Sequence, residues 1–275
     1  MKRRTLLIAA ASILSIARKS ALSQTTPAEF DREFRAYVAD VPALEDAHAF
    51  REIEYRDKSL LEEQGAMKGP KSDRHISQGG IELIVASEVS SKSVYEAGLK
   101  HPTWPKGNSG VTIGIGYDLG FVNEIAFADH WAGLLPDATI ETLANVCGKK
   151  GTDARDALAS VQHISVEWNP AADQFARYLP YVIAETERAF PNCADLSDDS
   201  LGALVSLVYN RGSDTSDTPR RHEMHVIREL MIAKNFPRIP AQIRAMKHIW
   251  AGDPDARGLL VRRELEAKLF EEGLG

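Results

Sequence analysis

The sequence predicts an α+β fold that is mostly helical and contains one small hairpin. Several segments between residues 76 and 270 repeat apolar residues at helical spacing. Residues 110–120 instead alternate apolar with small or polar residues, which is typical of a strand or a hairpin. The 275-residue chain has 44% hydrophobic and 26% charged residues, the composition of an ordinary globular protein.

Residues 1–23 are predicted to be a signal peptide. Basic residues at positions 2–4 precede an apolar run over 5–17, and small residues at 21–23 suit a cleavage site. The apolar run is shorter than the ~20 residues that span a bilayer, so export to the periplasm or the medium is favoured over a membrane anchor. This segment holds five basic and no acidic residues, and its removal would change the net charge from −6 to −11. An acidic chain of this kind is not expected to bind nucleic acid.

Residues 24–74 are predicted to be a helical N-terminal extension and linker. Phe30, Phe34, Tyr37 and Val38 indicate one amphipathic helix. A second helix is expected over residues 44–64, and the Gly-Pro pair within residues 65–73 is typical of a linker. No chemistry is assigned to this part of the chain.

The helix predicted over residues 76–95 carries the first candidate site residue. Ser77 is a suitable N-cap. Ile81 and Val85 share an apolar face, and Glu88 follows on the same face at i+7. Burial disfavours the charged form of a carboxyl and raises its pKa, as a general acid near neutral pH requires. An equal alternative is that Glu88 marks a frayed helix end and reaches water.

Residues 110–120, with the sequence GVTIGIGYDLG, form the second half of the candidate site. Period-two alternation places Thr112, Gly114, Gly116 and Asp118 on one face, an open floor with a hydroxyl at one end and a carboxylate at the other. Glycine inside a strand often marks the close approach of a ligand, which favours a sugar ring on this floor. A plain hairpin with flexible glycines is the alternative. The dinucleotide-binding fingerprint does not fit, because the strand-then-helix context is missing.

The spacing E-x6-Y from Glu88 to Tyr95, followed by GVTIGIGYD, resembles the phage-type lysozymes (muramidases), and most closely their pesticin-like branch. The resemblance implies a lysozyme-like fold in which a small hairpin lobe and a helical lobe flank a cleft. It implies cleavage of the β-1,4 bond between N-acetylmuramic acid and N-acetylglucosamine in peptidoglycan glycan strands, with no cofactor and no metal ion. It assigns residues 75–275 to the catalytic domain.

The resemblance also assigns roles to three side chains. Glu88 would be the acid that protonates the leaving oxygen, with Tyr95 as a supporting residue. Asp118, six positions after Thr112, would be the second carboxylate, and Thr112 would hold the attacking water. These roles imply an inverting hydrolase, in which the two carboxyl groups lie roughly 6.5–9.5 Å apart.

The sequence departs from ordinary phage lysozymes at two positions. Tyr117 replaces the His that follows their T-I-G-x-G motif, and it is a predicted substrate contact. Ala97 stands where they carry an Asp two positions after the Tyr, so Asp118 is the preferred second carboxylate and Glu96 the reserve. Trp104, in the loop between the two motifs, is interpreted as a sugar-stacking residue or, equally, as a packing plug.

After the hairpin, the sequence predicts helices joined by short turns, which would form the helical lobe. They cover residues 125–135, 140–146, 153–160, 170–189, 196–210 and 258–270. Pro180 is expected to kink or break the fourth of these helices. Ser197 is a candidate N-cap of the fifth, and Gly212 is expected to terminate it.

Two of these helices carry further candidate site residues by resemblance. The fifth ends in Y-N-R-G, similar to an aromatic-N-x-G turn near the family's cleft, so Asn210 and Arg211 are candidate sugar contacts. The last, GLLVRRELEAKLF, is similar to a G-L-x-x-R-R-x-x-E-x-x-L helix in which an Arg pairs with the catalytic Glu. Arg262 or Arg263 would face Glu88 and the other would face solvent. Such a pair would lower the pKa of Glu88 and oppose the effect of burial. A solvated charged helix is the alternative.

The two cysteines, Cys147 and Cys193, form a disulfide or remain two free thiols, and export is compatible with both. No His–Cys spacing indicates a zinc site.

Two other functions are open at this point. A lytic transglycosylase shares the lysozyme-like architecture but needs one Glu and no water-directing Asp. A non-catalytic cell-wall binding protein on a lysozyme-like fold would agree with the acidic charge and with Tyr117. The sequence does not separate the organism's own wall from a competitor's wall, and it identifies no immunity or secretion partner.

Overall fold

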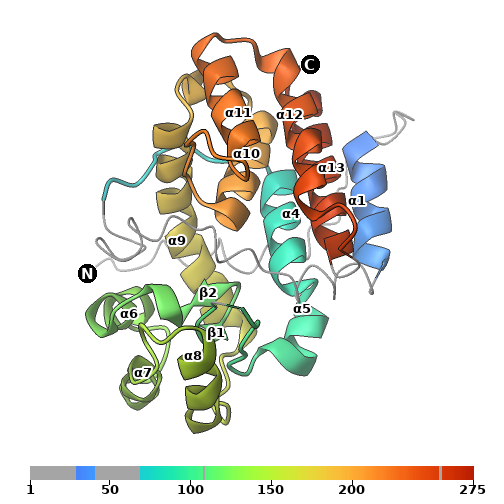
Figure 1. Ribbon diagram of the computed structural model, residues 1–275. Coiled ribbons are helices and arrows are strands. Elements are labelled where there is room, and N and C mark those ends of the chain that lie inside the picture. Colours follow the sequence, from blue (N-terminus) through green and yellow to red (C-terminus); the bar gives the residue numbers. More distant parts are fainter. Residues whose placement is uncertain (1–28, 41–68, 108, 254–255) are drawn as a thin grey trace, which may run out of the picture.

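The computed structural model describes residues 29–40, 69–107, 109–253 and 256–275 (Figure 1). These residues form a mostly helical fold with one two-stranded antiparallel sheet, so the α+β prediction is confirmed. The predicted signal peptide and the helix predicted over residues 44–64 lie outside the described residues. Among the residues described, no helix combines the length and the apolar character needed to cross a membrane.

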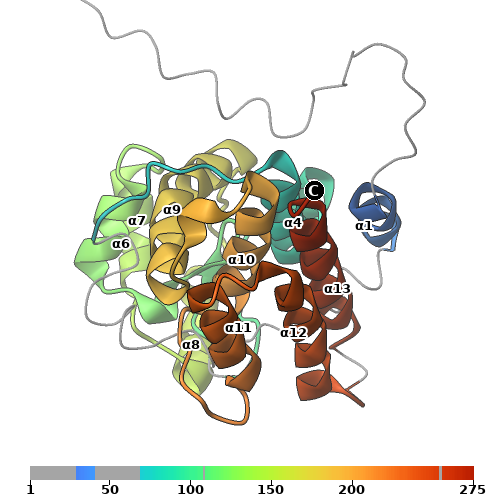
Figure 2. The ribbon, with the colours of Figure 1, turned by 90° about the horizontal axis from the view of Figure 1, so that it is seen from above.

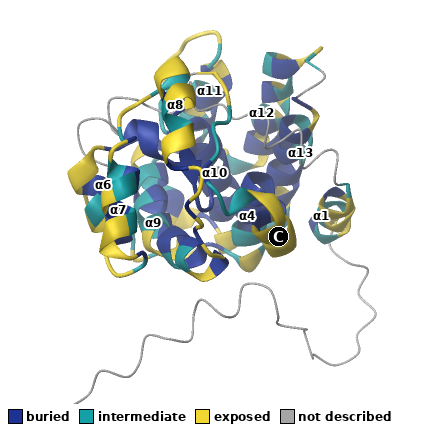
Figure 3. Cartoon of the chain, turned by 90° about the horizontal axis from the view of Figure 1, so that it is seen from below, coloured by how far each residue is buried: buried dark blue, intermediate teal, exposed yellow. Residues whose placement is uncertain are grey.

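Three long helices form the centre of the larger part of the molecule. They are α4 (Gln78–Val89), α10 (Asp198–Arg211) and α13 (Arg257–Glu272), and each packs against the other two. A Cβ added to Gly80 of α4 would lie 2.9 Å from the Cα of Gly202 in α10, so both glycines permit the close approach of the two helices. Every residue of α10 from Ser200 to Arg211 is buried (Figure 3).

Other helices surround this centre. The N-terminal helix α1 (Glu29–Ala39) lies at one edge of the molecule beside α13 (Figures 1 and 2). Phe30 and Tyr37 of α1 are buried, as the amphipathic pattern predicts, whereas Val38 is exposed. The remaining helices of this part are α11 (His222–Ile232) and α12 (Ile239–Ala245), with the short helices η6 (Cys193–Asp195), η7 (Phe236–Arg238) and η8 (Met246–Trp250).

The hairpin belongs to a smaller part of the molecule. Strand β1 (Thr112–Ile113) pairs with β2 (Tyr117–Asp118), and the register places Thr112 opposite Asp118. The short helix η4 (Leu119–Phe121) follows the hairpin. Then come α6 (Glu124–Trp131), α7 (Asp137–Ala144), α8 (Gly151–Ala157) and η5 (Leu158–Ser160).

The 22-residue helix α9 (Trp168–Ala189) connects the two parts (Figure 1). Pro180 does not break this helix, contrary to one of the two outcomes expected from the sequence. Leu179, Val182 and Ile183 are buried, so packing holds the helix together across the position where the proline removes a backbone donor. The carbonyl of Pro180 accepts a hydrogen bond from the N–H of Ser72.

The single helix predicted over residues 76–95 is interrupted in the structure. Helix α4 begins at the predicted cap, where the Ser77 hydroxyl accepts the N–H of Gly80, but it ends at Val89. Ser90 has a φ of 60°, and the Ser91 hydroxyl then caps α5 (Lys92–Val94), which continues into the π-helix η3 (Tyr95–Leu99). The interruption places Glu88 in the last turn of α4.

Candidate active site

Glu88 lies between the C-terminal helix and the turn of the hairpin. Its side chain is buried, with 5% of the residue exposed. One carboxylate oxygen, Oε1, accepts a hydrogen bond from Nη1 of Arg262 at 3.0 Å. The other oxygen faces the hairpin turn, because a Cβ added to Gly116 would lie 2.7 Å from Oε2.

Arg262 is the arginine that pairs with Glu88. Its guanidinium also contacts Glu266, with Nε to Oε1 at 3.2 Å, and donates from Nη2 to the carbonyl oxygen of Ser206 at 3.0 Å. Burial alone would lower the pKa of Arg262, but the Glu88 and Glu266 carboxylates together raise it above its ordinary value. Arg262 is therefore a permanent cation beside the Glu88 carboxyl.

Arg263 does not face solvent, so that part of the prediction is wrong. Its side chain is fully buried and donates to Glu266 at 2.8 Å, while its guanidinium lies 5.8 Å from the ring centroid of Trp250. Glu266 occupies the i+3 position from Arg263 and the i+4 position from Arg262, so it is placed to receive both. Helix α13 is buried along this face rather than solvated.

The glycines of the hairpin do not form the predicted open floor. Gly114 and Gly116 lie in the turn, with φ of 58° and 74°, and the strands are only two residues long. The chain reverses between Ile113 and Tyr117, so period-two alternation does not continue through the turn. A Cβ on Gly114 would meet the Trp131 ring at 3.1 Å, whereas Gly116 faces Glu88.

Thr112 and Asp118 are neighbours across the hairpin, and both are buried. The Thr112 hydroxyl has no hydrogen-bond partner among the described residues. The Asp118 carboxylate accepts the N–H of Gly110 at 3.0 Å and the N–H of Gly120 at 2.8 Å, which caps the short helix η4. These bonds fix the Asp118 side chain against the backbone of its own loop. The reserve carboxylate, Glu96, is exposed.

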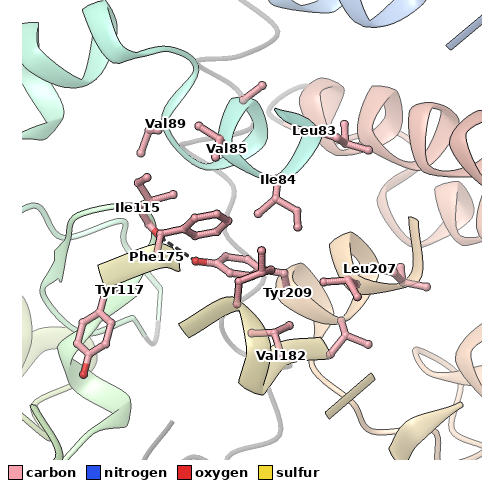
Figure 4. Packing of buried hydrophobic residues seen from close by; sticks show 14 of the residues in the cluster. Leu83, Ile84, Val85, Val89, Ile115, Tyr117, Phe175, Val182, Leu207 and Tyr209 are labelled. Atoms are coloured by element: carbon pink, nitrogen blue, oxygen red, sulfur yellow. Dashed lines mark hydrogen bonds between the residues drawn. The ribbon is translucent and has the colours of Figure 1, made fainter. Parts of the chain in front are cut away.

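Tyr117 points into the interior of the smaller part, not toward Glu88. Its hydroxyl lies 2.6 Å from Nδ1 of His130, and its ring packs edge-on against Trp131. In Figure 4 its side chain points away from Phe175 and Tyr209. Burial raises the pKa of Tyr117 well above its ordinary value. The structure thus gives Tyr117 a packing role, where the sequence predicts a substrate contact.

Tyr95 and Trp104 also make contacts within the protein. The Tyr95 hydroxyl donates to the carbonyl of Val166 at 2.7 Å, and its ring packs edge-on against Trp168. The half-buried Trp104 donates from Nε1 to the carbonyl of Ser109 at 3.1 Å. Of the two interpretations of Trp104, the structure agrees with the packing plug.

The Y-N-R-G turn reaches the hairpin through a residue that the sequence did not single out. Tyr209 donates from its hydroxyl to the carbonyl of Ile115 at 2.8 Å (Figure 4). Asn210 is buried, and its Oδ1 has no hydrogen-bond partner among the described residues. Arg211 is fully buried, with its guanidinium 5.2 Å from the ring centroid of Trp250, so it lies in the interior instead of at a sugar-binding surface. Gly212, with a φ of 76°, ends α10 as predicted.

Glu266 and Ser206 are the other contacts that sequence reasoning missed. The Ser206 hydroxyl donates to Glu266 Oε1 at 2.7 Å, and both residues are fully buried. The only signal for Glu266 was its place in the R-R-x-x-E spacing, and Ser206 had none.

A pocket of about 440 Å³ lies elsewhere, between α1, η8 and α13. Its lining includes Tyr37, Lys247 and Glu264 but none of Glu88, Thr112 and Asp118. It is therefore not the candidate active site, whose chemistry lies at the junction of α4, α13 and the hairpin.

Cys147 and Cys193 are free thiols in the structure and do not form the disulfide that was one of the two alternatives. Within the described ranges, no three His, Cys, Asp or Glu side chains cluster in a way that would hold a metal ion.

Searches against protein-family models and against curated proteins found no match. The chemistry of the site therefore rests on its own residues: a buried carboxyl beside a guanidinium and a glycine turn.

Proposed function

We propose that this chain is a lysozyme-like peptidoglycan hydrolase that cleaves the β-1,4 bond between N-acetylmuramic acid and N-acetylglucosamine. One observation carries the proposal. Glu88, Arg262 and Gly116 come from three motifs of the resemblance, and they meet at one point although Glu88 and Arg262 are 174 residues apart in the chain. Three motifs recognised separately in the sequence are thus brought together around one carboxyl group.

In this proposal, Glu88 protonates the glycosidic oxygen of the leaving sugar. Burial favours the neutral form of its carboxyl, and the Arg262 cation favours the charged form. Glycine at position 116 lets the hairpin turn lie close to Oε2, because a Cβ there would be only 2.7 Å from that oxygen, and a close approach of this kind is typical of a glycine beside a ligand site. Export guided by residues 1–23 would bring the protein to its substrate.

Thr112 would hold the attacking water, with Asp118 as the second carboxylate. A buried hydroxyl with no partner in the described part of the chain has its hydrogen-bonding capacity available for a water molecule. Asp118 lies across the hairpin from it. Protonation by Glu88 and attack by this water on the opposite side of the sugar would invert the anomeric configuration.

The second candidate function is a lytic transglycosylase, and the contacts of Asp118 favour it. A carboxylate already engaged by the N–H groups of Gly110 and Gly120 is tied to a structural role. A lytic transglycosylase needs only the acid, Glu88, and forms an anhydro product without an attacking water.

Digestion of purified peptidoglycan by residues 24–275, with the products identified by mass spectrometry, tests these proposals. Reducing muramic acid ends that disappear with Glu88→Gln would support the muramidase. Glu141→Gln is the matched control, because Glu141 is exposed on α7 and should leave the products unchanged. Anhydro ends that persist with Asp118→Asn would support the transglycosylase. Binding of peptidoglycan without any released product would overturn both in favour of a binding protein.

A further inference from the structure

Glu266 is a buried carboxylate that is not on the substrate side of the candidate site. It accepts hydrogen bonds from Ser206 Oγ at 2.7 Å, from Arg262 Nε at 3.2 Å and from Arg263 Nη2 at 2.8 Å. Its side chain and that of Arg263 are completely enclosed, and 2% of the Arg262 side chain is exposed. A charged side chain loses its hydration when it is buried, so buried charges are usually paired, as these are.

These side chains form one continuous array with Glu88. The order of contact is Glu88, Arg262, Glu266 and Arg263, so negative and positive charges alternate and the four sum to zero. Ser206 bonds to both central members of the array: its hydroxyl donates a hydrogen bond to Glu266, and its carbonyl accepts one from Arg262. Arg262 is therefore shared between two carboxylates, and its orientation toward Glu88 depends on the second one.

We propose, on the basis of the function proposed above, that Glu266 is a positioning residue that holds Arg262 against Glu88 and sets the pH at which Glu88 releases its proton. An anion on the far side of Arg262 offsets part of the field that the guanidinium exerts on Glu88. Without that anion, the ionised form of Glu88 would be favoured more strongly, and the acid would lose its proton at lower pH.

The substitution Glu266→Gln leaves in place the other ionisable side chains of the elements packed around Glu88. Helix α1 contributes Tyr37, whose pKa is raised chiefly by burial and also by the charges of Glu88 and Glu266. The hairpin contributes Asp118, which is directed to the amides of its own loop. Helix α10 contributes the uncharged Ser206 to the array. Glu266 is thus the side chain whose neutralisation isolates the effect of the second carboxylate.

The test is a carbon-13 NMR titration of the Glu88 carboxyl in the wild-type protein and in Glu266→Gln, with the resonance assigned by its loss in Glu88→Gln. Glutamine keeps the shape and one acceptor but removes the charge, and we expect Glu88 to titrate about one pH unit lower. The matched control is Glu264→Gln on the same helix, which removes a carboxylate bound to Arg244 and Lys247 and should leave the titration unchanged. An unchanged Glu88 titration in Glu266→Gln would overturn the proposal.

A second variant covers the case in which Glu266→Gln does not fold. The double change Glu266→Gln with Arg263→Gln removes an anion and a cation together, so the net charge of the array stays at zero. We expect a smaller shift of the same sign, because Glu266, unlike Arg263, contacts Arg262 directly. A shift to higher pH would contradict the proposal.

The pH profile of peptidoglycan cleavage gives an independent result. If the protein is a muramidase, its alkaline limb should move to lower pH in Glu266→Gln, whereas a purely structural role would lower the rate at every pH. The NMR titration needs no activity, so the two proposals fail separately. A shifted titration in a protein without activity would remove the proposed function alone, and an active enzyme with an unshifted titration would remove the positioning role alone.

Discussion

The guanidinium of Arg262 lies 3.0 Å from the carboxylate of Glu88, and both side chains are almost completely excluded from solvent. The pair joins the last turn of α4 to the C-terminal helix across 174 residues of sequence. A buried pair of this kind contributes little net stability when both partners are present, but removing one leaves an uncompensated charge. The first prediction follows from this asymmetry.

Replacement of Arg262 by methionine should destabilise the fold by about 3–5 kcal/mol, because it leaves Glu88 buried without its cation. Urea unfolding measures this loss. Arg244→Met is the control, since Arg244 also pairs with two carboxylates, Glu264 and Glu271, but is partly exposed and should cost only about 1 kcal/mol or less. Equal losses of unfolding free energy in the two variants would show that the buried pair is no more important for stability than the partly exposed one.

The stability deficit of Arg262→Met should depend on pH. Burial without a cation raises the pKa of Glu88 in the folded variant above its value in the unfolded chain. A group with a raised folded pKa favours folding at low pH, and that contribution is lost as the pH rises through the folded pKa. The deficit relative to the wild type should therefore be smaller in acid than at neutral pH, and a deficit that does not vary with pH would contradict this account.

Gly116→Ala should abolish cleavage while costing only modest stability. The new Cβ would lie 2.7 Å from Glu88 Oε2, so the carboxyl or the turn must move. The positive φ of 74° adds a strain of about 1–2 kcal/mol. Gly133→Ala separates the two effects, because Gly133 has a nearly equal φ of 71° and no atom within 4 Å of its added Cβ. Activity in Gly133→Ala should match the wild type, and normal activity in Gly116→Ala would place the reaction elsewhere.

Thr112→Val tests whether the unpartnered hydroxyl serves the reaction. The two side chains have similar shapes, and no hydrogen bond to the residues that the structure describes is lost, so unfolding stability should stay within about 1 kcal/mol or rise slightly. Cleavage should fall on the order of 10²-fold if the hydroxyl positions the attacking water. Thr112→Ser retains the hydroxyl and should retain most activity. A fully active Thr112→Val would favour the transglycosylase, in which no water is held.

The features that the sequence predicted well depend on local chemistry. The caps at Ser77 and Ser197 form as expected, because a serine hydroxyl needs only the N–H three residues ahead. Gly212 ends α10 because only its own backbone must adopt the positive φ. The amphipathic pattern around Phe30 and Tyr37 likewise predicts both a helix and its buried face.

The errors concern contacts that depend on distant parts of the chain. Tyr117 turns inward, where its hydroxyl shares a hydrogen bond with Nδ1 of His130 in a later helix. Arg263 is buried beside Glu266 and Trp250. The helical repeat of apolar residues alone does not show that a charged side chain has buried partners. Alternation of apolar and polar residues describes an extended strand and does not show where the chain reverses, so it does not predict the turn at Gly114 and Gly116.

The two cysteines give the last prediction. Burial raises the pKa of each thiol to about 12, so at pH 8 only a very small fraction of Cys147 or Cys193 is the reactive thiolate. Iodoacetamide should therefore alkylate the folded protein slowly and the denatured protein fully, with two adducts by intact mass. Cys147, which is less buried than Cys193, should react first. A native mass two hydrogens below the reduced value, with no alkylation after denaturation, would instead identify a disulfide and require a different arrangement of the segments that carry the two residues.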